Sequence, residues 1–283
     1  MSGNYSEKMV YLLMRLITYC VVLVIGFIVF DIVRRGAGAI NWEFLFTMPR
    51  RSGAQGGILP AIVGTLVLVA GSIVIAFPLG LAAAIYLSEY AHQGRFTRSV
   101  RAAIATLAGV PSIVFGLFGL GLFVIFLKWG ASIISGCATL ACMILPIIIV
   151  SSEEALRAVP QSLREGSLAL GATKWQTIWD NVLPYSIGGI LTGLILAIGR
   201  VAGETAPILL TVAAFYLPKL PHSIFDQVMA LPYHLYVLIT QHPDTAAVLP
   251  KAYGTALVLL LLVLGVGLVA IILRVHFRKK YKW

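Results

Sequence analysis

Arg200 and Glu204 are charged residues of opposite sign that lie four positions apart within an otherwise apolar segment. In an α-helix this spacing places both side chains on one face, where they can neutralise each other. A guanidinium group binds phosphate-like oxyanions through two parallel hydrogen bonds, and a carboxylate beside it keeps that binding weak enough for release. The pair therefore indicates either a gate on an anion pathway, with Thr205 beside it, or a buried ion pair that fixes its helix to neighbouring helices.

A second group of polar residues forms one stretch, from Glu153 to Pro184, between two apolar segments. A chain this apolar cannot use so many polar residues as a core, so the stretch must face water or another protein. Pro160 begins or breaks a helix, and Gly171 permits a sharp turn. We therefore expect two short helices, over residues 162–170 and 173–182, joined at the glycine.

Large apolar side chains recur at helical spacing in the second of these helices, at Trp175, Ile178 and Trp179. Exposed aromatic side chains of this kind favour burial in a groove of a partner protein. The alternative is that they pack on this chain's own helices or lie at the lipid interface.

The amino-acid composition indicates the class of protein that holds these polar groups in place. Of the 283 residues, 59% are hydrophobic and 11% are charged, whereas soluble domains contain about 25% charged residues. A soluble core could not bury this much apolar surface, so the solvent must be a lipid bilayer. The net charge of +10 is typical of basic loops on the cytoplasmic side of a membrane and does not require nucleic acid as a partner.

We expect an all-α integral membrane protein with six transmembrane helices, because a hydrocarbon core of about 30 Å requires about 20 helical residues. The apolar segments that reach or approach this length are 16–30, 58–88, 102–127, 129–152, 184–215 and 252–273. A proline-rich outer loop, about residues 217–251, contains an apolar stretch over 224–239 that predicts a re-entrant or surface helix. The N-terminus, the loop at 95–101, the polar stretch and the C-terminal tail together carry 13 Lys and Arg residues, against 7 in the segments on the opposite side. This bias predicts that both termini are cytoplasmic.

The sequence contains no recognisable binding motif for ATP or for a metal ion. It contains no G-x-x-x-x-G-K-[ST] motif, so the chain cannot bind ATP through a P-loop. Cys20, Cys137 and Cys142 lie in apolar segments without metal-binding spacing, and the five histidines form no such set. We therefore expect a transport subunit, not an enzyme, with no cofactor in this chain.

The polar stretch resembles a cytoplasmic loop of binding-protein-dependent ABC transporter permeases. That loop has the pattern E-A-A, three residues, G, nine residues, I-x-L-P, and this chain has Glu165, Gly171 and the run 181–184 at the same spacing. It departs from the pattern at the two positions after Glu165 and at Asn181, where the family has two alanines and an isoleucine. The resemblance implies a coupling helix that sits in a groove of a separate ATPase subunit. The residues assigned to this coupling are Glu165, Gly171, Ala172, Thr173, Lys174 and Trp175.

Longer runs resemble the phosphate-uptake permeases of the Pst type, specifically their PstA subunits, from about residue 56 to the C-terminus. These runs are 57–65, 78–80, 85–90, 109–119, 169–175 and 199–207. The resemblance implies the type I ABC importer permease fold. Residues 1–55 would form a first transmembrane helix and outer loop, and residues 56–283 a core permease domain with its coupling loop at about 153–184.

The same resemblance implies the partners and the location of the chain. It predicts a homologous PstC-like permease, two PstB-like ATPase subunits that bind ATP and Mg, and a periplasmic PstS-like phosphate-binding protein. The complex would work by alternating access in the bacterial inner membrane.

The residues alone leave other functions open. An ion-coupled secondary anion transporter would use Arg200 and Glu204 for substrate and proton and would need no ATPase. An intramembrane enzyme acting on lipid phosphates would need a catalytic set, and we find no convincing one in the sequence. An ABC importer of another oxyanion, such as sulfate or molybdate, would have the same architecture, because composition does not distinguish these substrates.

Overall fold

The computed structural model describes residues 3–50, 53, 55–214 and 216–280 of the chain. Within these residues, five helices are long and apolar enough to cross a membrane, or six if one strongly bent pair is counted as a single span. The five spans contain α1 (Gly3–Gly36), α3 (Leu59–Ile85), α6 (Ile133–Arg157), α9 (Leu183–Gly203) and α12 (Thr245–Lys280). The expected α-helical membrane fold is therefore confirmed.

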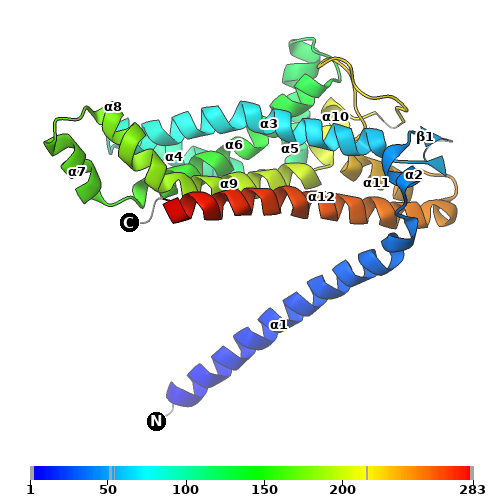
Figure 1. The fold of residues 1–283 in the computed structure, drawn as a ribbon, viewed down its shortest axis with the longest axis horizontal. Helices are drawn as coiled ribbons and strands as arrows, with labels where there is room; N and C mark the ends of the chain where they lie inside the picture. Colours follow the sequence, from blue (N-terminus) through cyan, green and yellow to red (C-terminus); the bar gives the residue numbers. More distant parts are fainter. Residues whose placement is uncertain (1–2, 51–52, 54, 215, 281–283) are drawn as a thin grey trace.

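Helices α3, α6, α9 and α12 lie side by side and form the core of the protein (Figure 1). Helix α6 is central in this core, and its Leu140 and Ile144 are completely buried. Glycine lets a neighbouring backbone approach α6 closely, since a Cβ atom added at Gly80 of α3 would lie 2.7 Å from Cγ2 of Ile148. Small residues at such crossings allow membrane helices to pack tightly where lipid supplies no hydrophobic driving force.

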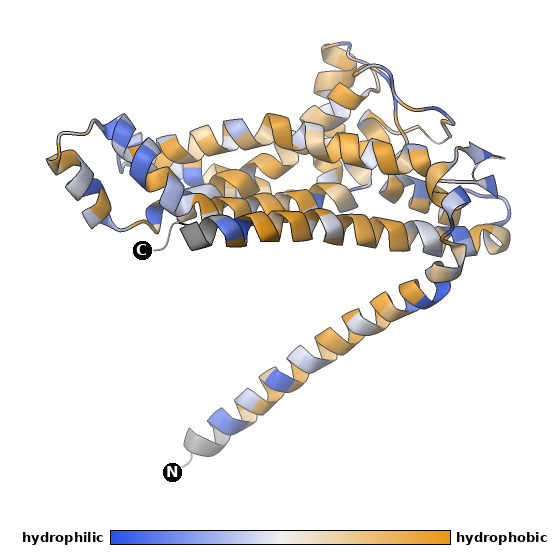
Figure 2. Ribbon diagram, in the orientation of Figure 1, coloured by the Kyte–Doolittle hydropathy of each residue, from blue (hydrophilic) through white to orange (hydrophobic). Residues whose placement is uncertain are grey.

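Helix α1 leaves the core at an angle and meets it only near its C-terminal end (Figure 1). At that contact, a Cβ atom added at Gly36 would lie 2.6 Å from the carbonyl oxygen of Tyr253 in α12. The long apolar part of α1 is exposed on all sides, and Figure 2 shows its hydrophobic character. A helix that is apolar all round requires lipid or another membrane protein as its surroundings.

The third predicted span, 102–127, is present as a strongly bent pair of helices and not as one continuous helix. The chain forms α4 (Arg95–Ala108), α5 (Ser112–Gly119) and a π-helical turn (Leu120–Phe126), and the two halves are bent by 100°. The bend lies at Gly109, Val110 and Pro111. Proline has no backbone N–H and disfavours helical conformation at the residue before it, so the hydrogen-bond ladder stops here.

The fifth predicted span, 184–215, is also interrupted. Helix α9 ends at Gly203, residues 204 and 205 form a break, and α10 (Ala206–Thr211) follows. In a continuous helix the ring of Pro207 would clash with the carbonyl group of Gly203, four positions earlier. The break therefore lies directly beside the predicted Arg200–Glu204 pair.

At the end of the core opposite residues 161–182, short elements cover the ends of the spans (Figure 1). They are a 3₁₀ turn (Ala37–Ala39), α2 (Trp42–Phe46), the antiparallel strands β1 (Pro49–Arg50) and β2 (Gln55–Gly56), and α11 (Leu231–Thr240). The β-hairpin was not predicted from the sequence. The outer-loop helix predicted over 224–239 begins only at Leu231, and one face of it is buried.

Residues 222–226 form a turn in place of the start of that helix. The carboxylate of Asp226 accepts hydrogen bonds from the backbone N–H groups of His222 (2.8 Å) and Ser223 (2.9 Å). These donors stabilise the charged form and lower the pKa of Asp226 below its ordinary value of 3.8. The carbonyl oxygen of Asp226 in turn accepts the N–H of Ile133 (2.9 Å), so the turn caps the start of α6.

Candidate functional site

The polar stretch forms an arm that projects beyond one end of the core (Figure 1). It consists of α7 (Gln161–Ala169), α8 (Lys174–Thr177) and a π-helical turn (Ile178–Val182) that continues into α9. Gly171 makes the turn between the helices with a φ of +87°, and its N–H donates to the carbonyl oxygen of Leu168 (3.0 Å). Thr173 begins α8 with a capping box in which Gln176 is the reciprocal partner. The first predicted helix and the glycine turn are therefore confirmed, whereas the second predicted helix is not separate, because it continues through the π-helical turn into α9.

Two tryptophans dominate the exposed surface of the arm. Trp175 and Trp179 are 57% and 55% exposed, and their rings stack with centroids 5.8 Å apart. Ile178 was predicted to share this surface, and that prediction is wrong because its side chain is 1% exposed. Leu170 at the turn is 91% exposed, so the arm exposes three large apolar side chains, which is typical of a protein-binding surface.

The other residues predicted for coupling lie on the same arm. Glu165 is exposed on α7, Ala172 is half-buried after the turn, and Lys174 begins α8. The ammonium group of Lys174 lies 4.7 Å from the ring centroid of Tyr90, which follows α3. The arm therefore contacts the core through a residue that the sequence pattern had assigned to coupling alone.

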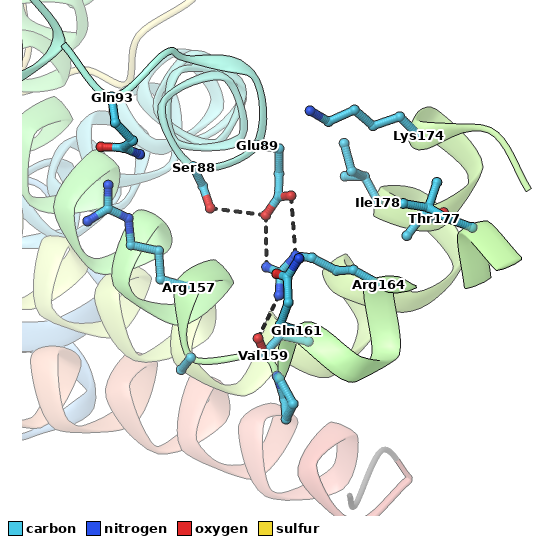
Figure 3. A pocket seen from close by; sticks show the side chains of 13 residues that line it. Ser88, Glu89, Gln93, Arg157, Val159, Gln161, Arg164, Lys174, Thr177 and Ile178 are labelled. Atoms are coloured by element: carbon cyan, nitrogen blue, oxygen red, sulfur yellow. Dashed lines mark hydrogen bonds and ion pairs between the residues drawn. The ribbon is translucent and has the colours of Figure 1, made fainter. Parts of the chain in front are cut away.

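A cavity of about 660 Å³ lies between the base of the arm and the core, and Figure 3 shows the side chains that line it. Glu89 and Arg164 point toward each other there. Two guanidinium nitrogens bind the two carboxylate oxygens, with Nη2–Oε1 at 2.9 Å and Nε–Oε2 at 3.3 Å. The same guanidinium donates to the carbonyl oxygens of Val159 (2.6 Å) and Leu156 (2.8 Å) at the end of α6. Sequence reasoning did not find this pair, because nothing in the sequence connects residues 75 positions apart.

A second ion-pair network lies beside this cavity. The Glu153 carboxylate, 10% exposed, binds Nε of Arg101 (2.7 Å) and Nη2 of Arg157 (2.8 Å). Arg101 also donates to the carbonyl oxygen of Leu87 (2.7 Å). The network joins α4 and α6 to the end of α3, so charged side chains hold the spans together at the end that carries the arm.

Arg200 lies in the last turn of α9, and Glu204 follows the helix as its C-terminal cap with extended backbone. The Nε of Arg200 and the Oε1 of Glu204 are 3.6 Å apart, so the predicted ion pair is present although Glu204 is not on the helix. Their side chains are 30% and 16% exposed, and Thr205 is half-buried beside them. A guanidinium has five N–H donors, and one ion pair cannot occupy all of them. The pair is therefore chemically able to receive an oxyanion.

Two interrupted spans meet beside this pair. Helices α5 and α10 each follow a break, and a Cβ atom added at Gly116 of α5 would lie 3.0 Å from Cα of Pro207 in α10. Within a membrane, non-helical backbone is tolerated only where protein buries it or where it lines a water-filled cavity. The break at residues 204 and 205 is therefore a suitable place for a polar path past the core.

The sequence profile of the family described as binding-protein-dependent transport system inner membrane component matches residues 76–283. The chain is 35% identical over 253 residues to the probable ABC transporter permease protein YqgI from Bacillus subtilis (strain 168), covering 84% of this chain and 85% of that protein. It is 40% identical over 220 residues to the phosphate transport system permease protein PstA 1 from Mycobacterium tuberculosis (strain CDC 1551 / Oshkosh), covering 77% of this chain and 71% of that protein.

Solved structures have the same fold. A chain of a bacterial ABC transporter involved in the import of the acidic polysaccharide alginate matches with a TM-score of 0.65 and 15% identity, covering 96% of each chain. A chain of the methionine ABC transporter MetNI in an inward-facing conformation matches with a TM-score of 0.60 and 16% identity, covering 78% of this chain and 94% of that chain. At these identities the likeness concerns the fold, and it supports the predicted type I ABC importer permease architecture.

Proposed function

This chain belongs to the family of binding-protein-dependent transport system inner membrane components, and we propose that it is the transmembrane permease subunit of an ATP-driven phosphate importer. The family and the apolar helices make it a multi-pass protein of the inner membrane. The observation that carries the choice of substrate is the similarity to phosphate transport permeases over most of the chain. The arm and the Arg200–Glu204 pair supply the two activities that such a subunit needs, which are coupling and anion passage.

The arm is the proposed contact with the ATPase. Its stacked tryptophans and the exposed Leu170 offer an apolar surface for a groove on a PstB-like subunit, which would bind ATP and Mg. Glu165, Ala172, Thr173 and Lys174 complete this surface. Two ATPase subunits would serve this chain and a homologous PstC-like permease, which would contribute the other half of the path.

A matched pair of glycine substitutions tests whether the shape of the arm matters for coupling. Gly171→Ala places a Cβ atom in a left-handed conformation at φ +87°, which costs about 1–2 kcal/mol. Gly166→Ala adds the same methyl group where the surroundings are open, and alanine favours a helix interior by about 0.5–1 kcal/mol. We expect slower ATP-driven uptake for Gly171→Ala only. Equal uptake rates in the two variants would contradict a role for the turn.

The break beside Arg200 is the proposed path. Arg200 would bind phosphate oxygens through its guanidinium, while Glu204 would keep the binding weak and Thr205 would offer a hydroxyl. Tight capture would belong to a periplasmic PstS-like protein that delivers phosphate to the outer side. A weak site of this kind suits alternating access, because the anion must leave within each cycle.

The proposed orientation places the arm and both termini in the cytoplasm. Basic residues gather at the end of the core that carries the arm, where Arg101, Arg157 and Arg164 lie, and the positive-inside bias favours the cytoplasm for such an end. ATP binding would close the ATPase dimer, move the arm and open the outer mouth. Hydrolysis would then return the path to the inward-facing state.

Radiolabelled phosphate uptake tests the proposal directly. The chain would be reconstituted in proteoliposomes with its PstC-like, PstB-like and PstS-like partners, with ATP enclosed or absent. We expect uptake only with ATP, and excess unlabelled sulfate should not compete. Uptake by this chain without an ATPase would favour a secondary transporter, and competition by sulfate would favour an importer of another oxyanion.

A further inference from the structure

Each of the two helices of the arm contacts the π-helical turn that ends α3, which spans Tyr86–Tyr90. Helix α7 reaches it through Arg164 and Glu89, and α8 reaches it through Lys174 and Tyr90. Figure 3 shows Arg164 pointing toward Glu89 and Lys174 nearby, and all three residues line the cavity. π-Helical turns are rare and frequently occur at functional sites. Two consecutive residues of this turn, Glu89 and Tyr90, therefore contact the two helices of the arm.

The Glu89–Arg164 pair is the directional part of this contact. The two side chains are 8% and 13% exposed, whereas those of the Arg35–Asp31 pair on α1 are 56% and 28% exposed. A bidentate pair between a guanidinium and a carboxylate has a defined geometry as well as a favourable energy. Because Arg164 also binds the carbonyl oxygens of Val159 and Leu156, it joins α7 to the ends of both α3 and α6.

Apart from this pair, α7 is bonded through Ser167, whose hydroxyl lies 3.0 Å from that of Thr177 and accepts a hydrogen bond from Asn181 (3.1 Å); both partners belong to the arm itself, so these bonds do not tie α7 to α3. Within the described chain, α7 buries none of its residues. Its Leu163 packs on a small apolar cluster that includes Ala84, Leu156 and Val182. Apolar contacts are not directional, so this cluster alone would let α7 slide over the core when the arm is displaced.

We propose that the Glu89–Arg164 pair is a strut that transmits displacement of the arm to α3, with Lys174 on Tyr90 as a weaker second contact. The strut rests on the proposed function, because the displacement comes from an ATPase bound to the arm. Glu89 and Arg164 are positioning residues in this scheme. They touch neither ATP nor phosphate, and they convert motion of the arm into motion of a transmembrane helix.

Neutralising the strut should uncouple the transporter without dissociating it. Glu89→Gln keeps the size of the side chain and removes its charge. In the reconstituted complex we expect ATP hydrolysis to continue, while phosphate moved per ATP falls by at least about fivefold, the lower end of typical coupling effects. Arg164→Lys should have a similar effect because lysine cannot form the bidentate fork. The double variant should be no worse than either single variant, since both remove one shared interaction.

The matched control is Asp31→Asn, which removes a carboxylate from the exposed ion pair on α1 and should leave the ratio of phosphate to ATP unchanged. Tyr90→Leu is a milder variant at an exposed position. It removes the cation–π contact and should lower the ratio about two- to fivefold, as expected for a contact of about 0.5–1 kcal/mol. An unchanged ratio in assembled Glu89→Gln complexes, or additive losses in the double variant, would overturn the strut.

Hydrogen–deuterium exchange supplies a readout that does not depend on transport. In the wild-type complex, ATP should change the exchange of amides in the arm and in residues 86–91 together. In Glu89→Gln, ATP should change the arm only, and in Tyr90→Leu the change at residues 86–91 should be reduced. If residues 86–91 respond equally in wild type and both variants, the strut is wrong. If wild-type complexes take up phosphate without ATP, the proposed function fails instead.

Discussion

Replacing Arg200 with glutamine is expected to lower ATP-dependent phosphate uptake by about 10- to 100-fold, because a hydrogen bond to a charged group contributes about 1.5–3 kcal/mol. Glutamine keeps a polar side chain but carries no charge. It also leaves the carboxylate of Glu204, 16% exposed, without the guanidinium that lies 3.6 Å away. An incoming phosphate would then meet uncompensated negative charge. The measurement is radiolabelled phosphate uptake into proteoliposomes, with complex assembly checked by co-purification.

Two further substitutions make the result specific. Arg200→Lys keeps the charge but loses the bidentate geometry, so its uptake should lie between that of wild type and that of Arg200→Gln. Arg35→Gln removes a guanidinium from another pair with i,i+4 spacing, Arg35 with Asp31 on α1, and should transport normally. Wild-type uptake by Arg200→Gln would show that Arg200 has no transport role. Failure of that variant to assemble would identify the buried structural ion pair, the second hypothesis from the sequence.

Hydropathy was sufficient to predict most of the spans because a bilayer leaves an apolar segment of about 20 residues few alternatives to a helix. The turn of the arm was also predictable. Gly171 lies between two polar helical segments, and its φ of +87° is accessible mainly to glycine. In both cases the physical constraint acts within one short segment of chain.

Prolines show where such reasoning stops. Pro78 and Pro146 lie inside the continuous helices α3 and α6, whereas Pro111 precedes α5 and Pro207 lies in the first turn of α10. All four occur in apolar segments, and the sequence does not distinguish them. The outcome depends on distant neighbours, as at the close approach of Gly116 to Pro207. The same limit hid the Glu89–Arg164 pair, whose members each resemble an ordinary solvated charge in the sequence.

Replacing Trp175 and Trp179 together with alanine is expected to weaken binding of the ATPase subunit by at least about 30-fold. A tryptophan at the centre of an interface commonly contributes about 2 kcal/mol or more, which is about 30-fold, and because such contributions are not additive this is the lower limit for the pair. Both rings are more than half exposed in the isolated chain, so their removal leaves no cavity in the core and the permease should still fold. The measurement is the Kd of detergent-solubilised permease for the ATPase subunit.

Trp42 supplies the matched control for this result. It is 78% exposed and its ring lies 4.7 Å from that of Phe46, which makes it a second exposed aromatic pair at the opposite end of the molecule. Because the proposed orientation places Trp42 on the outer side, Trp42→Ala should leave the Kd for the ATPase unchanged. Equal weakening by both changes would mean that the loss reflects general damage to the permease. An unchanged Kd in the Trp175/Trp179 variant would remove the tryptophans from the interface, and the contact with the ATPase would then have to be made by the polar residues of the arm.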